Sequence, residues 1–266
     1  MNERYDTIGV MYNAYRHADT RIVTLLKQFL ELPKGATILD VGAGTGNYTN
    51  ALAASGYKLK AVEPSAVMRG QVVPHPGVEW FAGTAASIPL PDGAVDGVVS
   101  VLAVHHFPDL ALAAKEMRRV GGTGPMVLFT IDPGKGEPFW FTDYFPGIYQ
   151  RLLDAFVPVE RLISVFGKGR DTTASIHAFP LPSDLSDLNM HAGWNRPKIY
   201  LNPDIRRSMS GFAMADSAEV EKGLGLLRRD LETGQWDKRN GHLRATDSYD
   251  LGFVLVKIQP GKPGIS

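Results

Sequence analysis

Short apolar runs alternate with segments of helical periodicity along most of the chain. The first helical segment carries Ile22, Leu26 and Leu30 on one face, and Asp19 or Thr20 can cap its start. We predict seven strands, one starting at Ile38 and the others over residues 58–63, 78–81, 96–103, 126–131, 173–181 and 249–258. Strands that alternate with helices favour an α/β fold, in which a mostly parallel sheet is covered by helices on both faces.

Residues 182–247 separate the last two predicted strands, whereas a hairpin loop usually needs only about 2–5 residues. Pro203 starts a short helix in this segment, and a longer helix runs from Asp216 or Ser217 to Gly234. Residues 151–166 also have the pattern of a helix. We therefore expect a helical cover that is inserted late in the chain.

Composition and charge exclude several classes of protein. The 266 residues include 28 basic and 28 acidic side chains, a balance that argues against nucleic acid or an anionic membrane as a partner. We find no apolar run long enough to cross a bilayer and no secretory leader pattern. With no cysteine, the chain has no disulfide, thiolate metal site or cysteine nucleophile, and we expect it in the cytoplasm.

Three glycines at alternate positions follow the first predicted strand. Asp40 lies near the end of that strand, Gly42, Gly44 and Gly46 come next, and a helix begins at Asn47. Glycine accepts backbone angles closed to other residues and leaves no side chain between the backbone and a ligand. The dinucleotide fingerprint G-x-G-x-x-G places its third glycine one position later, so the spacing here argues against a nicotinamide cofactor.

A second acid, Glu63, ends the next apolar run, at a place where a carboxylate accepts hydrogen bonds from the two hydroxyls of a ribose. The chain resembles the class I S-adenosylmethionine (SAM)-dependent methyltransferases of the small-molecule, type 11-like group. The resemblance is carried by one order of features: strand, Asp40, G-x-G-x-G, helix, strand and Glu63-Pro64-Ser65. The resemblance extends to Asp132 and thins beyond it. It implies a Rossmann-like fold with a seven-stranded sheet, whose final two strands form an antiparallel pair at one edge.

The resemblance also implies roles for the residues of these motifs. Asp40, Gly42, Gly44 and Gly46 are expected to shape the pocket for the methionine part of SAM, and Glu63 is expected to hold the ribose.

Two further segments correspond to cofactor-binding parts of the family. Thr84 and Ala85 stand where the family binds adenine, although the family usually has an aspartate at the position of Thr84. A hydroxyl accepts the bond from the adenine amino group without charge assistance. Near the N-terminus, Tyr12 and Tyr15 are candidates to lie beside the sulfonium, and Arg16 to bind the methionine carboxylate. The alternative for the tyrosines is packing of the following helix onto the sheet.

Two adjacent histidines follow the fourth predicted strand, at the edge where open α/β sheets bind their ligands. A neutral imidazole of His105 or His106 can take a proton from the acceptor as the methyl group arrives, or can orient the acceptor. Adjacent residues seldom point the same way, so we expect one of the two to reach the substrate. A metal site needs a third ligand at a fitting spacing, and the sequence has none.

We therefore predict a methyltransferase that moves the SAM methyl group to a small acceptor. Residues 1–132 would form the SAM-binding core with its N-terminal cover. Residues 133–266 would supply the remaining strands and two substrate-cover insertions, at 133–170 and 182–247, within the same domain. The alternative for the insertions is added core or an oligomer surface. The alternatives for the whole chain are a SAM-binding protein without catalysis and an NAD(P)-dependent oxidoreductase.

Overall fold

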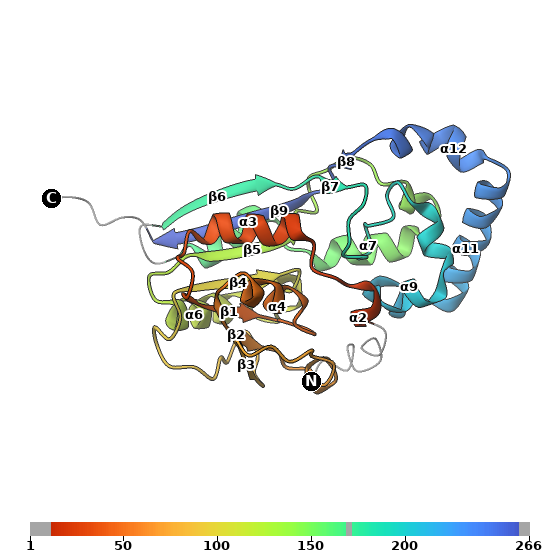
Figure 1. The fold of residues 1–266 in the computed structure, drawn as a ribbon. Coiled ribbons are helices and arrows are strands. Elements are labelled where there is room, and N and C mark those ends of the chain that lie inside the picture. Colours follow the sequence, from red (N-terminus) through yellow and green to blue (C-terminus); the bar gives the residue numbers. More distant parts are fainter. Residues whose placement is uncertain (1–11, 169–171, 261–266) are drawn as a thin grey trace.

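A seven-stranded sheet in the order β3-β2-β1-β4-β5-β9-β6 organises the fold (Figure 1). β3, β2, β1, β4 and β5 run parallel, and β9 is antiparallel to both of its neighbours. This confirms the predicted Rossmann-like α/β sheet with an antiparallel pair at one edge. In this computed structural model, which describes residues 12–168 and 172–260, the strands are β1 (Thr37–Val41), β2 (Lys58–Val62), β3 (Val78–Phe81), β4 (Gly97–Val101), β5 (Met126–Ile131), β6 (Thr172–Ala178) and β9 (Phe253–Pro260).

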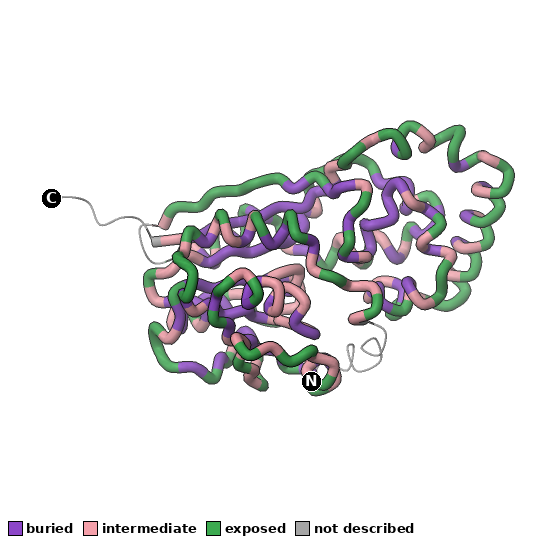
Figure 2. The backbone as a smooth tube through the Cα atoms, in the orientation of Figure 1, coloured by how far each residue is buried: buried purple, intermediate pink, exposed green. Residues whose placement is uncertain are grey.

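Helices cover both faces of the sheet. On one face α3 (Thr20–Leu30) and α4 (Asn47–Ala54) pack their apolar side chains against the sheet, and on the other face α6 (Leu110–Gly121) and α8 (Val159–Phe166) do so. The predicted cap is confirmed, because the Asp19 carboxylate accepts a hydrogen bond from the Arg21 N–H over 3.0 Å at the start of α3. The central strands are accordingly buried, whereas β6 at the edge is largely exposed (Figure 2).

The fourth strand ends earlier than the predicted Ala103. Leu102 has a positive φ of 51°, which turns the chain out of the extended conformation, and its N–H donates to the Phe129 carbonyl over 2.8 Å. The chain then enters the 3₁₀ turn η2 (Val104–His106). The two histidines therefore lie on a tight turn rather than at a strand end.

The segment predicted as one helix over 151–166 is two helices. α7 spans Pro146–Ala155 and α8 spans Val159–Phe166. Pro158 separates them, since proline has no N–H to donate and restricts the residue before it.

Residues beyond β6 form the late helical insertion, which gathers at one end of the sheet (Figure 1). A two-stranded sheet of β7 (Leu181–Pro182) and β8 (Ser248–Tyr249) joins the two ends of this insertion. The predicted helices starting at Pro203 and Ser217 are confirmed, the second with Asp216 as its cap. The insertion contains η4 (Pro197–Leu201), α9 (Pro203–Arg207), α10 (Ser210–Ala213), α11 (Ser217–Glu232), α12 (Gln235–Asn240) and η5 (Gly241–Ala245). It packs against α7 through α10 and against η3 (Trp140–Asp143) through the rings of Trp140, Tyr200 and Trp236.

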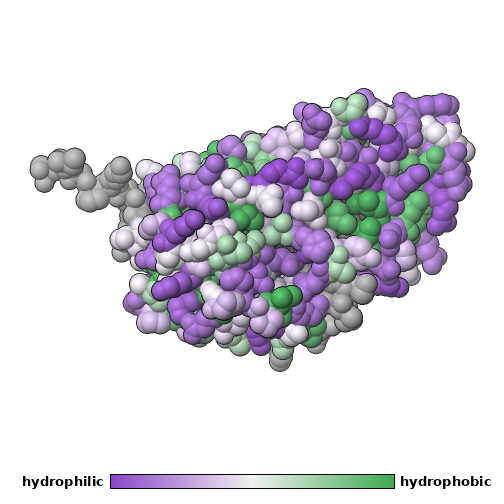
Figure 3. Space-filling view, in the orientation of Figure 1, coloured by the Kyte–Doolittle hydropathy of each residue, from purple (hydrophilic) through white to green (hydrophobic). Residues whose placement is uncertain are grey.

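Aromatic side chains fill the interior of this helical part. Trp140, Trp194, Tyr200 and Trp236 are all buried, and the Trp140 indole N–H donates to the Trp194 carbonyl over 2.6 Å. The outer side of α11 and α12 carries hydrophilic residues (Figure 3). These aromatic residues thus build a core. No helix in the described part of the chain is long and apolar enough to span a membrane.

Candidate active site

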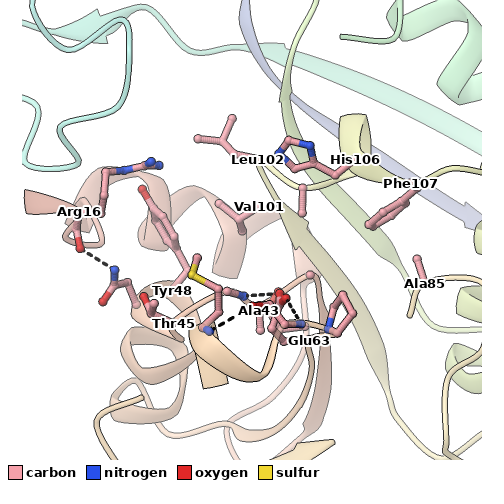
Figure 4. Close-up of a pocket in the computed structure, with 18 of the residues that line it drawn as sticks. Arg16, Ala43, Thr45, Tyr48, Glu63, Ala85, Val101, Leu102, His106 and Phe107 are labelled. Carbon is pink, nitrogen blue, oxygen red and sulfur yellow. Dashed lines mark hydrogen bonds between the residues drawn. The ribbon is translucent and has the colours of Figure 1, made fainter. Parts of the chain in front are cut away.

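A cavity of about 910 Å³ lies beyond the carboxyl ends of β1, β2 and β4 (Figure 4). This is the edge at which open α/β sheets bind ligands, and the volume is typical of a small-molecule site. The wall is built by Arg16 and His17, by parts of residues 40–48, 63–68, 84–85 and 101–108, and by Asp187 of the late insertion.

The glycine loop after β1 is shaped by backbone angles and close packing. Gly42 has φ 76°, and a Cβ there would lie 2.6 Å from the Cβ of Ala103. Gly46 has φ 85°, and a Cβ there would lie 2.7 Å from the Trp80 ring, so this glycine shapes the turn without lining the cavity. Gly44 also has a positive φ, 59°, but a Cβ there would meet only the Cε of Met68, at 3.7 Å, so the loop is less closely packed here, where it lines the cavity.

Asp40 and Glu63 both lie in the wall, and both are buried. The Asp40 carboxylate accepts a hydrogen bond from the Thr49 hydroxyl over 2.6 Å, while its other oxygen, Oδ1, has no partner among the described residues. Burial, helped by the charge of Glu63, raises the pKa of Asp40 to about 6.

The Glu63 carboxylate holds two loops together. One oxygen accepts from the Gly44 N–H and the other from the Ser65 N–H, each over 2.9 Å (Figure 4). Burial raises the pKa of Glu63. Since a carboxylate has about four acceptor positions, Glu63 keeps capacity for further donors on its cavity side.

Thr84 and Ala85 both line the cavity, and Ala85 lies at the opposite end from Arg16 (Figure 4). The Thr84 N–H and C=O are both used in a turn with Ser87, at 3.3 and 3.1 Å. The backbone of Thr84 is therefore committed to the turn, and its side-chain hydroxyl is the group left for a ligand.

The N-terminal segment contributes Arg16 to the cavity wall, whereas Tyr15 packs against the apolar core and is absent from the wall. Tyr12 begins the short helix α2 (Tyr12–Tyr15), but its side chain lies outside the described residues. The Asn47 side chain donates to the Arg16 carbonyl and so fixes the segment to the start of α4.

Arg16 forms a partly buried cluster with two residues from distant parts of the chain. Its guanidinium pairs with the Asp187 carboxylate through both Nε and Nη2, the second over 3.3 Å. The Tyr48 hydroxyl donates to the same carboxylate over 3.3 Å. Burial, followed by the charge of Asp187, raises the pKa of Tyr48 well above its usual value, so this hydroxyl stays a neutral donor.

The structure separates the two histidines. His106 lies in the cavity wall, above the glycine loop and beside Leu102 and Phe107 (Figure 4). His105 lies outside the cavity wall, and its ring packs on Phe156 in a tilted arrangement with centroids 4.1 Å apart. Its buried Nδ1 has no hydrogen-bond partner among the described residues. Burial, with a smaller contribution from His106, holds the pKa of His105 well below its ordinary value. Within the described residues, no group of three or more His, Asp or Glu is placed to hold a metal ion.

Several residues of the cavity wall were not assigned to the site from the sequence, among them Tyr48, Leu102 and Asp187. Tyr48 follows the glycine motif directly, so its place at the start of a helix was a usable signal. The positive φ of Leu102 and the position of Asp187 have no local signature, since one depends on the turn after β4 and the other on contacts 171 residues apart.

The strand order, the glycine loop at the end of β1 and the acid at the end of β2 define the class I methyltransferase fold. Comparisons with known proteins agree. Residues 39–129 match the family model described as a methyltransferase domain. The chain is 30% identical over 182 residues to the 2-phytyl-1,4-naphtoquinone methyltransferase of Thermosynechococcus vestitus, covering 65% of this chain and 78% of that protein. It is also 30% identical over 161 residues to the demethylmenaquinone methyltransferase of Bacillus licheniformis, covering 58% and 68%.

A solved structure is more similar still. It is that of an Anabaena variabilis protein assigned as a methyltransferase from an antibiotic biosynthesis pathway, with 43% identity, a TM-score of 0.89, and coverage of 91% of this chain and 98% of that chain. The present chain belongs to the S-adenosylmethionine-dependent methyltransferases, and it transfers the methyl group of that cofactor to a small-molecule acceptor.

The polar groups of the cavity wall fit this cofactor. The absence of a side chain at Gly44, where the only close atom is Met68 Cε, lets a ligand approach the loop. The unpartnered oxygens Asp40 Oδ1 and Thr45 Oγ1 are buried in the wall and require polar partners from a ligand or water. Arg16 supplies a cation at one end, and Glu63 supplies acceptors in the middle.

Proposed function

We propose that SAM lies along the cavity with its methionine part at the glycine loop and Arg16, its ribose at Glu63 and its adenine at Thr84 and Ala85. The support is that these residues line one continuous cavity, with Arg16 at one end, Glu63 in the middle and Ala85 at the other (Figure 4). In this arrangement Gly46 acts indirectly by shaping the turn. Asp40 anchors Thr49 of α4 with one oxygen and leaves Oδ1 for a polar partner in the cavity.

We further propose that His106, and not His105, faces the acceptor. When bound, SAM supplies an electrophilic methyl group, so the protein has to position a nucleophile, exclude water and accept a proton if one is released. Of the two histidines, His106 is the one in the cavity wall, which is the observation that carries this assignment. His105 would hold the turn through its packing on Phe156.

The acceptor class follows from the surroundings of His106. Val101, Leu102 and Phe107 make this part of the wall apolar, and two relatives are named for methylation of a naphtoquinone and of demethylmenaquinone. We therefore propose a ring compound with an apolar body as the acceptor. The insertions at 133–170 and 182–247 would cover it from the solvent, in a protein of the cytoplasm.

Two variants test the role of His106. His106→Ala is expected to lower kcat by about 10²–10⁴-fold with a quinol acceptor that the wild type methylates, while leaving the affinity for S-adenosylhomocysteine (SAH) within a factor of about two. His105→Ala is the matched control, with a much smaller fall in kcat, because its ring is outside the cavity. Unchanged turnover in His106→Ala would remove His106 from the reaction.

A further inference from the structure

The first loop of the late insertion is tied to the N-terminal segment by bonds on both sides of Asp187. Asp184 pairs with Arg21 over 2.6 Å, and the Ser186 N–H donates to the Asp19 carboxylate over 3.2 Å. On the other side, the Leu188 N–H donates to a backbone carbonyl of the N-terminal segment over 3.1 Å. Asp187 is therefore held in place by the backbone around it.

This loop places a negative charge in the cofactor cavity. The Asp187 side chain lines the cavity and is only 2% exposed. Arg16 and the Tyr48 hydroxyl use three of the roughly four acceptor positions of its carboxylate. Arg16 and Tyr48 lie together at the end of the cavity away from Ala85 (Figure 4).

A largely buried pair of one cation and one anion matches the free amino-acid group that ends SAM. That group carries a carboxylate and an ammonium on the same carbon, so it is a zwitterion. A lone Arg16 would favour any anion at this end of the cavity, whereas Arg16 together with Asp187 offers one partner to each charge. The Arg16–Asp187 pair has no net charge, and a zwitterion keeps that balance. A ligand end that carries only one of the two charges would add an uncompensated charge, which is costly in a largely enclosed site.

We propose that Asp187 binds the α-ammonium of the cofactor beside Arg16, so that the late insertion completes the cofactor site. The proposal rests on the placement of the methionine part at Arg16. It makes Asp187 a determinant of specificity for the amino-acid end of the cofactor. It also gives the insertion a direct contact with the cofactor, through a loop that is fixed to the N-terminal segment.

Binding of three ligands to Asp187→Asn tests the contact. The ligands are SAH, its analogue without the α-amino group, and 5′-methylthioadenosine, which lacks the whole amino-acid end. Asparagine keeps the size of the side chain and an acceptor oxygen for Arg16. Asp184→Asn is the matched control. Asp184 belongs to the same loop and forms an ion pair with Arg21, but its side chain is 77% exposed and lies outside the cavity.

We expect Asp187→Asn to weaken SAH binding by about ten- to a hundredfold, since a charge-assisted hydrogen bond is lost. The same variant should bind the deaminated analogue and 5′-methylthioadenosine as the wild type does, and Asp184→Asn should bind all three unchanged. Equal weakening for all three ligands would show a structural role only. Tighter SAH binding by Asp187→Asn would show that Asp187 competes with the cofactor for Arg16. Either result overturns the proposal. If the wild-type protein itself does not bind SAH, the proposed function is overturned instead.

Discussion

Replacement of Asp40 by asparagine should change how the stability of the protein depends on pH. The Asp40 carboxyl is buried, and its pKa is raised from 3.8 to about 6, chiefly by burial and in part by the charge of Glu63. Between these two pH values the folded protein retains a proton that the unfolded chain has released. Raising the pH therefore favours the unfolded chain, and the Asp40 contribution to stability is lost as the pH rises through about 6.

The size of the effect follows from the shift. A pKa difference of about 2 units at about 1.4 kcal/mol per unit gives about 3 kcal/mol in all. Since part of this is already lost at pH 4, the free energy of unfolding falls by about 2 kcal/mol between pH 4 and pH 7. Asparagine has nearly the same shape, and its side-chain oxygen can accept the hydrogen bond from Thr49. The stability of Asp40→Asn relative to wild type should therefore rise by about this amount over that range.

Urea denaturation of both proteins at half-unit pH steps gives the difference in their free energies of unfolding at each pH. The contributions of the other titrating groups cancel in this difference. Asp19→Asn serves as a control of opposite sign. Although burial raises the pKa of Asp19, hydrogen bonds from Arg21 and Ser186 outweigh it and hold the pKa below its usual value. Wild type should gain stability over Asp19→Asn as the pH rises from acid. A flat difference curve for Asp40→Asn would refute the reasoning about its burial.

Two further predictions concern packing. Gly42→Ala should weaken SAH binding at least about tenfold and destabilise the protein by more than about 2 kcal/mol. Gly35 has a similar φ of 86°, but a Cβ there would meet no atom within 4 Å. Gly35→Ala should therefore destabilise the protein by only about 1 kcal/mol and leave SAH binding intact. Equal costs in urea denaturation would mean that contact with Ala103 is unimportant. Trp140→Ala should destabilise by about 3–5 kcal/mol, because it empties a buried site and leaves the Trp194 carbonyl without its donor. A loss below about 1 kcal/mol would show that this aromatic core is not tightly packed.

The parts of the fold and site that the sequence predicted are those with short-range causes. The glycine loop needs positive φ at Gly42, Gly44 and Gly46, and only glycine adopts it freely, so the requirement is visible in the sequence. The same holds for Glu63, since an acid at the end of a parallel strand has a fixed place at the sheet edge.

What the sequence did not predict depends on distant contacts or on local geometry without a clear signal. Asp187 reaches the cavity only because its loop binds the N-terminal segment, and nothing near residue 187 indicates this. The orientation of His106 relative to His105 depends on the 3₁₀ turn that follows Leu102. The break between α7 and α8 did have a signal, Pro158, which the helical periodicity around it concealed.

The most direct test of the account is a calorimetric titration of the wild-type protein with SAH, in parallel with NAD. The cavity that Gly44, Glu63 and Arg16 form predicts one SAH site per chain and much weaker or undetectable binding of NAD. Folded protein that gives no heat and no measurable affinity with SAH, or that binds NAD more tightly, would contradict it.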